Sequence, residues 1–450
     1  MRARFMVLFP IAIAAWAACG PAANVPTDTA GDVDADEMDD AQADPRDAET
    51  ESDAARRGYG EPCTTNAQCE GRFCITPALD ASFVDGYCSA FMCDPRFEGA
   101  CGSDAVCFDI EIYPPLCART CSSDADCRGP HYVCIGTCVP AAFVAAVDRP
   151  GVLDGDEATI RSAVEAVSAE RMMRRVRILA GEADWDRPDG PVRIRSRAVG
   201  HPDHALAVAY VEAELAAIGL APARLPFDAL GLPHVNVVAE IPGAEPSLPP
   251  LLLTAHFDST AVNTPGWSAA TDPAPGAVDN GSGVAIALEI ASILAATGAT
   301  PPRRTIRIVL FDGEEDGLLG SRDYTADLAA AAEPVSCTLN VDMVGWSTPP
   351  TAGRFWYVFS EDSRPSAALG IEAVDLFVPS ARPIASTFTE AGHSDHAAFW
   401  AHDLCAVGMA SFPRMPSNHT VDDTSSEFHS EFFLDVARAA VAVTAAWAAM

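Results

Sequence analysis

The chain has 450 residues, of which 49% are hydrophobic, so it can bury a large core and form more than one domain. Its formal net charge is −34 at pH 7, and it contains no lysine. This acidic balance argues against nucleic acid or an anionic lipid surface as a partner, because both carry negative charge.

The N-terminus has the pattern of a secretory signal. Arg2 and Arg4 precede an apolar stretch, residues 5–18, which is too short to span a bilayer. Two alanines stand directly before Cys19, as in lipoprotein cleavage sites where a lipid is attached to the thiol. Ordinary cleavage nearby is the alternative. We therefore expect residues 1–19 to direct export and to give an outer-membrane or cell-surface lipoprotein anchored through Cys19, or a secreted protein.

An acidic segment follows the signal. Residues 27–55 hold twelve Asp or Glu and the single basic residue Arg46, with few large apolar side chains. Such a segment cannot bury enough apolar surface to offset the entropy of ordering. We predict that residues 20–60 form a disordered tether.

Cysteines are concentrated in the next part of the chain. Twelve of the fifteen lie between Cys63 and Cys138, and behind an export signal this density indicates disulfides rather than zinc. Six bridges are possible within residues 61–140. The segments 63–69 and 121–127 share their spacing and much of their composition, which favours two small related modules. Their Asp and Asn side chains could bind calcium, but solvent-facing turns are the preferred interpretation.

Strands and helices alternate in the remaining chain, residues 155–450. Apolar spacing of three or four predicts helices over 157–181 and 204–218, and a further helix over 284–296. Short apolar runs predict strands, at 235–242, 251–255, 305–310, 336–341, 355–360 and 404–410. This pattern is typical of an α/β fold with helices on both faces of one sheet. Cys337 and Cys405 lie in this part and either pair or remain buried thiols.

Three of the predicted strands end in metal-binding residue types. His256 follows the run 251–255, Glu314 and Glu315 follow the run 305–310, and Asp342 follows the run 336–341. Ligands bind at the carboxyl ends of strands in open α/β sheets, so these side chains are candidates for one metal site. Buried structural histidines and solvated turn acids are the alternatives.

Neighbouring residues within these segments indicate a division of roles. Asp258 lies two residues after His256, on the same side of the strand, where a carboxylate orients an imidazole ligand. Glu314 and Glu315 are adjacent and cannot both point to one place. One is therefore expected to bind a metal while the other moves a proton.

These residues belong to a series of short motifs that resembles the co-catalytic di-zinc aminopeptidases. The resemblance covers about residues 160–450, and the same superfamily includes glutamate carboxypeptidases, glutaminyl cyclases and the transferrin-receptor ectodomain. The motifs occur in the family's order, as His256-Phe-Asp258-Ser, Gly276-Ala-Val-Asp279-Asn280-Gly-Ser-Gly283, Gly313-Glu314-Glu315-Asp-Gly317, Asn340-Val-Asp342-Met343, Ser394-Asp-His396 and His419-Thr-Val-Asp-Asp423-Thr424. Together they are far more specific than any single motif.

The resemblance implies a metal centre of two Zn²⁺ ions in a mixed, largely parallel α/β sheet. Its ligands are expected to be five residues: His256 and Asp342 for one zinc, Glu315 and His419 for the other, and Asp279 between them. Glu314 is the expected general base and Asp258 the carboxylate that orients His256. The chain departs from the family at Asn418, where several aminopeptidases have Tyr as an oxyanion stabiliser.

The sequence thus predicts an exported zinc exopeptidase that acts on peptides or proteins, most simply an aminopeptidase. The alternatives within the superfamily are a carboxypeptidase or a glutaminyl cyclase. A different class is a non-catalytic binding protein on this scaffold, with the cysteine modules carrying recognition. The complete set of predicted ligands and Glu314 argue against that class.

Overall fold

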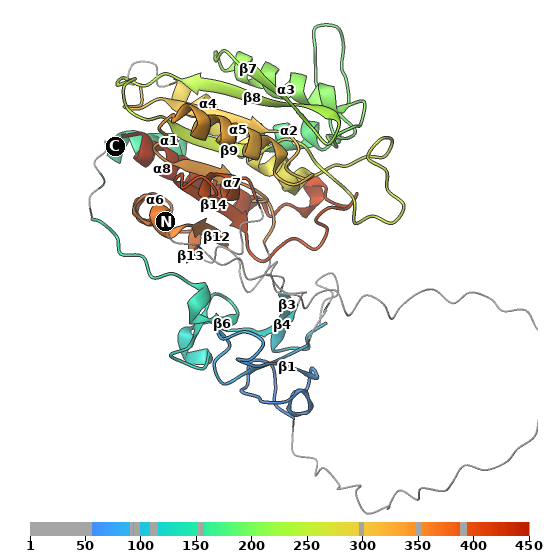
Figure 1. Cartoon of the computed structure of the whole chain (residues 1–450), viewed down its shortest axis with the longest axis vertical. Coiled ribbons are helices and arrows are strands. Elements are labelled where there is room, and N and C mark those ends of the chain that lie inside the picture. The colour runs from blue at the N-terminus through green and yellow to red at the C-terminus, as the bar shows by residue number, and fades with distance from the viewer. Residues whose placement is uncertain are drawn as a thin grey trace, which may run out of the picture. The chain divides into compact units, whose positions relative to one another are not determined.

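A computed structural model shows the fold of the chain (Figure 1). It describes residues 56–90, 93, 100–108, 116–151, 153, 157–296, 301–347, 353–387 and 394–449. The predicted signal, Cys19 and most of the predicted acidic tether therefore lie outside the described residues. Residues 55–450 form one compact unit.

The centre of this unit is an eight-stranded mixed sheet, which confirms the predicted fold class. Its strands lie in the order β13-β12-β14-β11-β9-β10-β8-β7, and the central strands β14, β11, β9 and β10 are parallel to their neighbours in that group. The strands are β7 (Ala223–Ala229), β8 (Leu232–Ile241), β9 (Leu251–His256), β10 (Ile306–Phe311), β11 (Thr338–Val341), β12 (Arg354–Phe359), β13 (Arg382–Ser386) and β14 (Ala406–Ser411).

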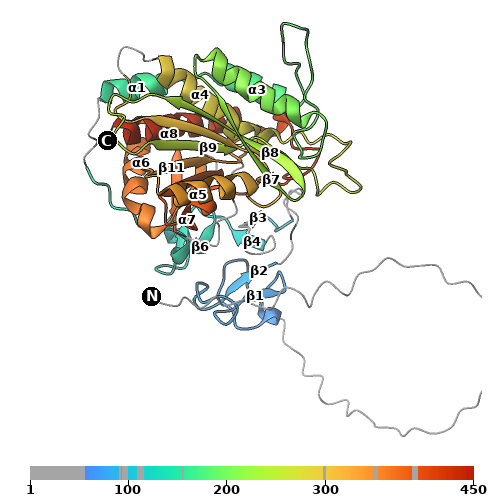
Figure 2. The same cartoon turned by 45° about the horizontal axis from the view of Figure 1, so that its top comes forward.

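Helices cover both faces of the sheet (Figure 1 and Figure 2). Alternation along β10 decides which side chain meets which layer: Ile306 and Ile308 join the larger core with α4 and α8, and Val309 joins the smaller core with α5 and α7. The helices are α1 (Glu157–Glu165), α2 (Ala169–Leu179), α3 (His204–Ala217), α4 (Gly283–Ala296), α5 (Leu319–Ala331), α6 (Arg364–Phe377), α7 (His396–Trp400) and α8 (Ser430–Ala449).

Two helices of the described residues, Ala277–Ala296 and Ser430–Ala449, are long and apolar enough to span a membrane by length and composition alone. They are 94% and 72% buried within the protein. Their apolar character is therefore explained by packing in the core.

The single helix predicted over 157–181 is wrong, because the structure has two helices there. The chain leaves helical conformation after α1, and Ser168 begins α2 with its side chain accepting a hydrogen bond from the Arg171 N–H. The Ser168 N–H is in turn bound by the buried carboxylate of Glu289 at 2.8 Å. The cap at Ser168, whose N–H binds a buried carboxylate, starts a new helix although the apolar spacing continues through this segment.

The cysteine-rich segment contains three modules, so the prediction of two related modules is wrong. Each is a two-stranded hairpin with two disulfides that join its first cysteine to its third and its second to its fourth. The hairpins are β1 (Phe73–Ile75) with β2 (Tyr87–Ser89), β3 (Ala105–Phe108) with β4 (Leu116–Arg119), and β5 (Tyr132–Cys134) with β6 (Cys138–Pro140). The predicted disulfides are confirmed, with all six possible bridges formed, and a seventh joins Cys337 to Cys405.

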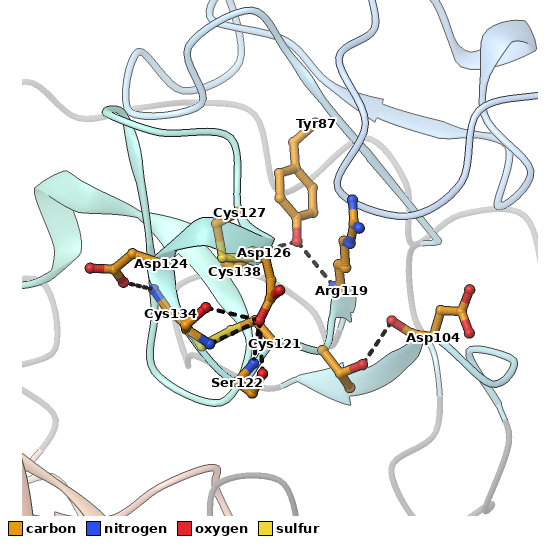
Figure 3. The surroundings of a disulfide bond; sticks show 12 residues. Tyr87, Asp104, Arg119, Cys121, Ser122, Asp124, Asp126, Cys127, Cys134 and Cys138 are labelled. Carbon is orange, nitrogen blue, oxygen red and sulfur yellow. Dashed lines mark hydrogen bonds between the residues drawn. A yellow bond between two sulfur atoms is a disulfide. The ribbon is translucent and has the colours of Figure 1, made fainter.

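Polar side chains of these modules serve the turns. Around the Cys121–Cys134 disulfide, Asp124 accepts a hydrogen bond from the Cys134 N–H, and Asp126 accepts bonds from Ser122 and Ser123 (Figure 3). In the first module Asn66 binds the Cys74 N–H in the same way. Because main-chain N–H groups occupy these oxygens, the turn interpretation is favoured over calcium binding.

Candidate metal centre

His256 lies at the carboxyl end of β9, in the middle of the sheet. The side chain is 1% exposed, and its Nδ1 atom lies 3.3 Å from Oδ1 of Asp258. Asp258 also accepts hydrogen bonds from the N–H groups of Glu314 and Glu315, at 3.2 and 3.1 Å. One buried carboxylate therefore fixes both the imidazole ring and the turn that carries the two glutamates.

Asp279 occupies an irregular turn, Ala277–Ser282, that leads into α4. Its Oδ1 atom lies 3.2 Å from Nε2 of His256, and its Oδ2 atom lies 3.1 Å from Nε2 of His419. The two oxygens of a single carboxylate thus face two different imidazoles. This is the arrangement expected of a ligand shared by two metal ions.

Asp342 and Glu314 lie on the His256 side. Oδ1 of Asp342 is 3.3 Å from His256 Nε2, and Oε2 of Glu314 is 3.9 Å from the same atom. Burial raises the pKa of Glu314 well above its ordinary value, and the negative charges of Asp342 and Glu315 add to this effect. Glu314 thus favours its protonated form when no cation is near.

Glu315 and His419 lie on the other side, with Oε2 of the glutamate 2.9 Å from Nε2 of the histidine. Burial, with the nearby charge of Asp279, raises the pKa of Glu315 to about 7. Burial lowers the pKa of His419, but its hydrogen bonds to Asp279 and Glu315 outweigh this and raise it to about 10.

The donor set fits zinc. His256, Glu314 and Asp342 each offer a ligand atom within 4.8 Å of the others, and so do His256, Asp279 and Glu315. Oε1 of Glu315 is buried without a hydrogen-bond partner. Imidazole nitrogens and carboxylate oxygens suit Zn²⁺, and several buried carboxylates need compensating positive charge. All six residues predicted from the motifs for the metals and the base, together with Asp258, meet here.

Asn418 contributes a contact that the sequence did not indicate. Its Nδ2 atom donates to Oδ2 of Asp279 at 2.5 Å, and its own Oδ1 accepts from Arg414, also at 2.5 Å. Its position before His419 had marked it only as a departure from the family's Tyr. The structure shows that it binds the shared carboxylate.

A further acid, Asp395, is fully buried beside the centre. Burial raises its pKa to about 7, and the charges of Asp342 and Asp258 act in the same direction. Asn340 binds the preceding residue, Ser394, at 2.8 Å and so ties this turn to β11. The motif Ser394-Asp-His396 had no assigned role in the sequence, and the structure places it next to the predicted ligands.

Comparisons with known proteins show what this region is similar to. Residues 236–444 match the sequence profile of Peptidase family M28. Over these residues the chain is similar to the M28 peptidases. The match confirms the resemblance drawn from the motifs, and it contains every residue proposed for the metals and the base.

Individual relatives agree with the family. A probable zinc metalloprotease of Leptosphaeria maculans is 40% identical over 113 residues, which are 25% of this chain and 25% of that protein. Aminopeptidase YwaD of Bacillus subtilis is 31% identical over 156 residues, 33% of this chain and 29% of the relative. The chain thus spans less than a third of the length of these curated relatives.

A solved structure shows the same fold. The crystal structure of the Legionella pneumophila LapA aminopeptidase aligns with a TM-score of 0.55 at 17% sequence identity, and covers 68% of this chain and 77% of that one. The chain therefore shares the fold of that protein, which agrees with the predicted fold class.

Zinc binding to this centre is expected to release protons. In the metal-free protein His419 is protonated below a pKa of about 10 and Glu315 below a pKa of about 7. Zinc binds these groups only after they lose their protons, so apparent zinc affinity should fall as the pH falls below neutral. Calorimetric titrations at neutral pH, in buffers of different ionisation enthalpy, should show release of at least one proton per chain. Zinc binding without proton release would contradict the assignment of His419 as a ligand.

Proposed function

We propose that the chain is an exported di-zinc aminopeptidase that releases N-terminal residues from peptides. The observation that carries this proposal is the carboxylate of Asp279, which faces His256 through one oxygen and His419 through the other. A site built for a single metal has no need of such a shared ligand. The related B. subtilis protein is named an aminopeptidase, which supports the same reaction class.

The proposed ligands divide into two sets that share one member. His256 and Asp342 would hold one zinc, Glu315 and His419 would hold the other, and Asp279 would belong to both sets. Bound zinc at such a pair lowers the pKa of water and polarises the scissile carbonyl.

The protein's own groups supply proton transfer and orientation. Glu314 accepts a proton from the attacking water and donates it to the leaving amine. Asp258 fixes the ring of His256 and, through two N–H groups, the positions of both glutamates.

A panel of substrates tests the reaction. The full-length, zinc-loaded protein should release the first residue from peptides and aminoacyl anilides with a free N-terminus, and acetylation of that terminus or a chelator should abolish release. Faster release of C-terminal residues from N-blocked peptides would indicate a carboxypeptidase. Cyclisation of an N-terminal glutamine would indicate a glutaminyl cyclase, and absence of all turnover with full zinc occupancy would indicate a binding protein.

Substitutions of the adjacent glutamates separate their roles. Glu314→Gln keeps the size of the side chain but cannot accept a proton, so zinc content should stay normal while kcat falls by roughly 10²–10⁴. Glu315→Ala removes a ligand atom, so zinc occupancy of one position should fall. Metal analysis and kinetics of both purified variants measure this. Asp316→Asn, an exposed acid in the same turn, is the matched control and should retain both zinc and turnover.

A Glu314→Gln protein that loses zinc, or one with near-normal turnover, would show that the two roles are assigned wrongly. Loss of zinc in the Asp316→Asn control would show that metal content depends on the turn's overall charge instead.

We further propose export with a lipid anchor on Cys19. Seven disulfides among the described residues support export, because such bridges form and persist in oxidising compartments. Mass spectrometry of the mature N-terminal peptide should find Cys19 as the first residue, carrying acyl chains. An unmodified N-terminus downstream of Cys19 would instead support simple secretion.

A further inference from the structure

The segment Pro275–Asp279, which carries the shared carboxylate, is held by two buried charged residues from distant parts of the chain. The first is Arg197, whose side chain has no exposed surface. Its guanidinium donates hydrogen bonds to main-chain carbonyl oxygens at five positions: Phe257 at 2.6 Å, Leu179 at 2.8 Å, Pro275 at 2.6 Å, Gly276 at 2.8 Å and Asp279 at 3.5 Å. The planar fork of an arginine thus joins the end of α2, the residue after His256 and the start of the Asp279 turn.

The second is Asp423, which is 1% exposed. Its carboxylate accepts hydrogen bonds from the N–H groups of Val278 at 2.8 Å and Asp279 at 3.0 Å. Its main-chain carbonyl accepts a third bond, from the Ala277 N–H at 3.1 Å. Three consecutive N–H groups of the turn are therefore bound by this one residue.

Arg197 and Asp423 bind opposite polar groups of the same short segment. Arg197 donates hydrogen bonds to carbonyl oxygens, and Asp423 accepts them from N–H groups. The peptide planes of the turn therefore have little freedom to rotate. Gly276 has φ +50°, and a Cβ there would lie 2.3 Å from the Asp279 carbonyl oxygen and 2.9 Å from Arg197 Nη2. The packing around the turn therefore leaves no space for a side chain at position 276.

We propose that Arg197 and Asp423 are positioning residues that hold the Asp279 carboxylate with one oxygen toward each metal position. Both side chains bind the main chain of the segment that presents Asp279, so they act through that backbone. This inference rests on the proposed function only in that two metal ions share the centre. A loosened turn would still allow Asp279 to bind one ion, but it would no longer keep both oxygens in place.

Two conservative substitutions test the pair. Asp423→Asn has the same shape but offers one acceptor oxygen in place of two, and Arg197→Lys keeps the charge but loses the fork. The control is Arg175→Lys, since Arg175 is a buried arginine whose partners Glu214, Glu289 and Ser292 lie on α3 and α4, away from the turn. All three are made in the full-length protein.

The experiment titrates Co²⁺ into the metal-free protein and monitors binding by absorption spectroscopy. Electron paramagnetic resonance then reports coupling between two bound ions. Both test variants should bind one Co²⁺ normally and the second about 10–100-fold more weakly, with loss of coupling. In the zinc-loaded proteins kcat should fall while KM stays close to the wild-type value. The control should bind two coupled ions even where its Tm falls as far as that of the test variants.

The proposal is overturned if both test variants bind two coupled Co²⁺ ions as wild type does, or if the control loses the second ion to the same degree. If one test variant does not fold, the other decides. A wild-type protein that binds two coupled ions but cleaves no peptide would refute the proposed function and leave this inference standing. A wild-type protein that binds only one ion would refute the inference whatever its turnover.

Discussion

The centre of this protein depends on one buried carboxylate that faces two imidazoles. Asp279 lies between His256 and His419, with Asp342 and Glu315 beside them, and four of the five side chains are at most a tenth exposed. Three carboxylates taken out of water at such short range repel one another strongly. In the metal-free protein protons on the histidines and on Glu315 relieve that repulsion, and bound zinc would replace them. The raised pKa values and the predicted proton release are therefore two expressions of the same electrostatic constraint.

The sheet brings these groups together because β9, β10 and β11 are adjacent and parallel. Phe311 at the end of β10 lies in register with His256 at the end of β9, and β11 runs along the other side of β9. Side chains that follow the three strands must therefore meet at one edge. Asp279 and His419 lie on turns outside the strands. Their positions are therefore not fixed by the sheet and need further contacts.

This difference explains what the sequence could reveal. The residues after the three strands were predictable, because an apolar run followed by His, Glu or Asp has a known consequence in a parallel sheet. Asp279 and His419 required the family resemblance. Arg197 has no local signal at all, because its partners are main-chain carbonyl oxygens, which any residue can provide.

The errors have equally local causes. Helix 157–181 was predicted as continuous because apolar spacing does not show where Ser168 and the buried Glu289 interrupt it. The middle cysteine module escaped notice because Cys93 and Cys101 are spaced differently from the first pair of cysteines in the other two modules. In the helix a tertiary partner, absent from the local pattern, decides the structure.

The two adjacent glutamates show how one turn produces two chemical roles. Asp258 binds the N–H groups of both residues, so their backbones share one anchor while their side chains diverge. Glu315 reaches His419 at 2.9 Å, whereas the nearest approach of Glu314 to an imidazole is 3.9 Å, to His256. Burial raises the pKa of both, but Glu315 has a cationic partner in the metal-free protein and Glu314 has none at bonding distance. A carboxylate that lies beside the centre without a fixed partner is free to exchange a proton, and this is the property that a general base must keep.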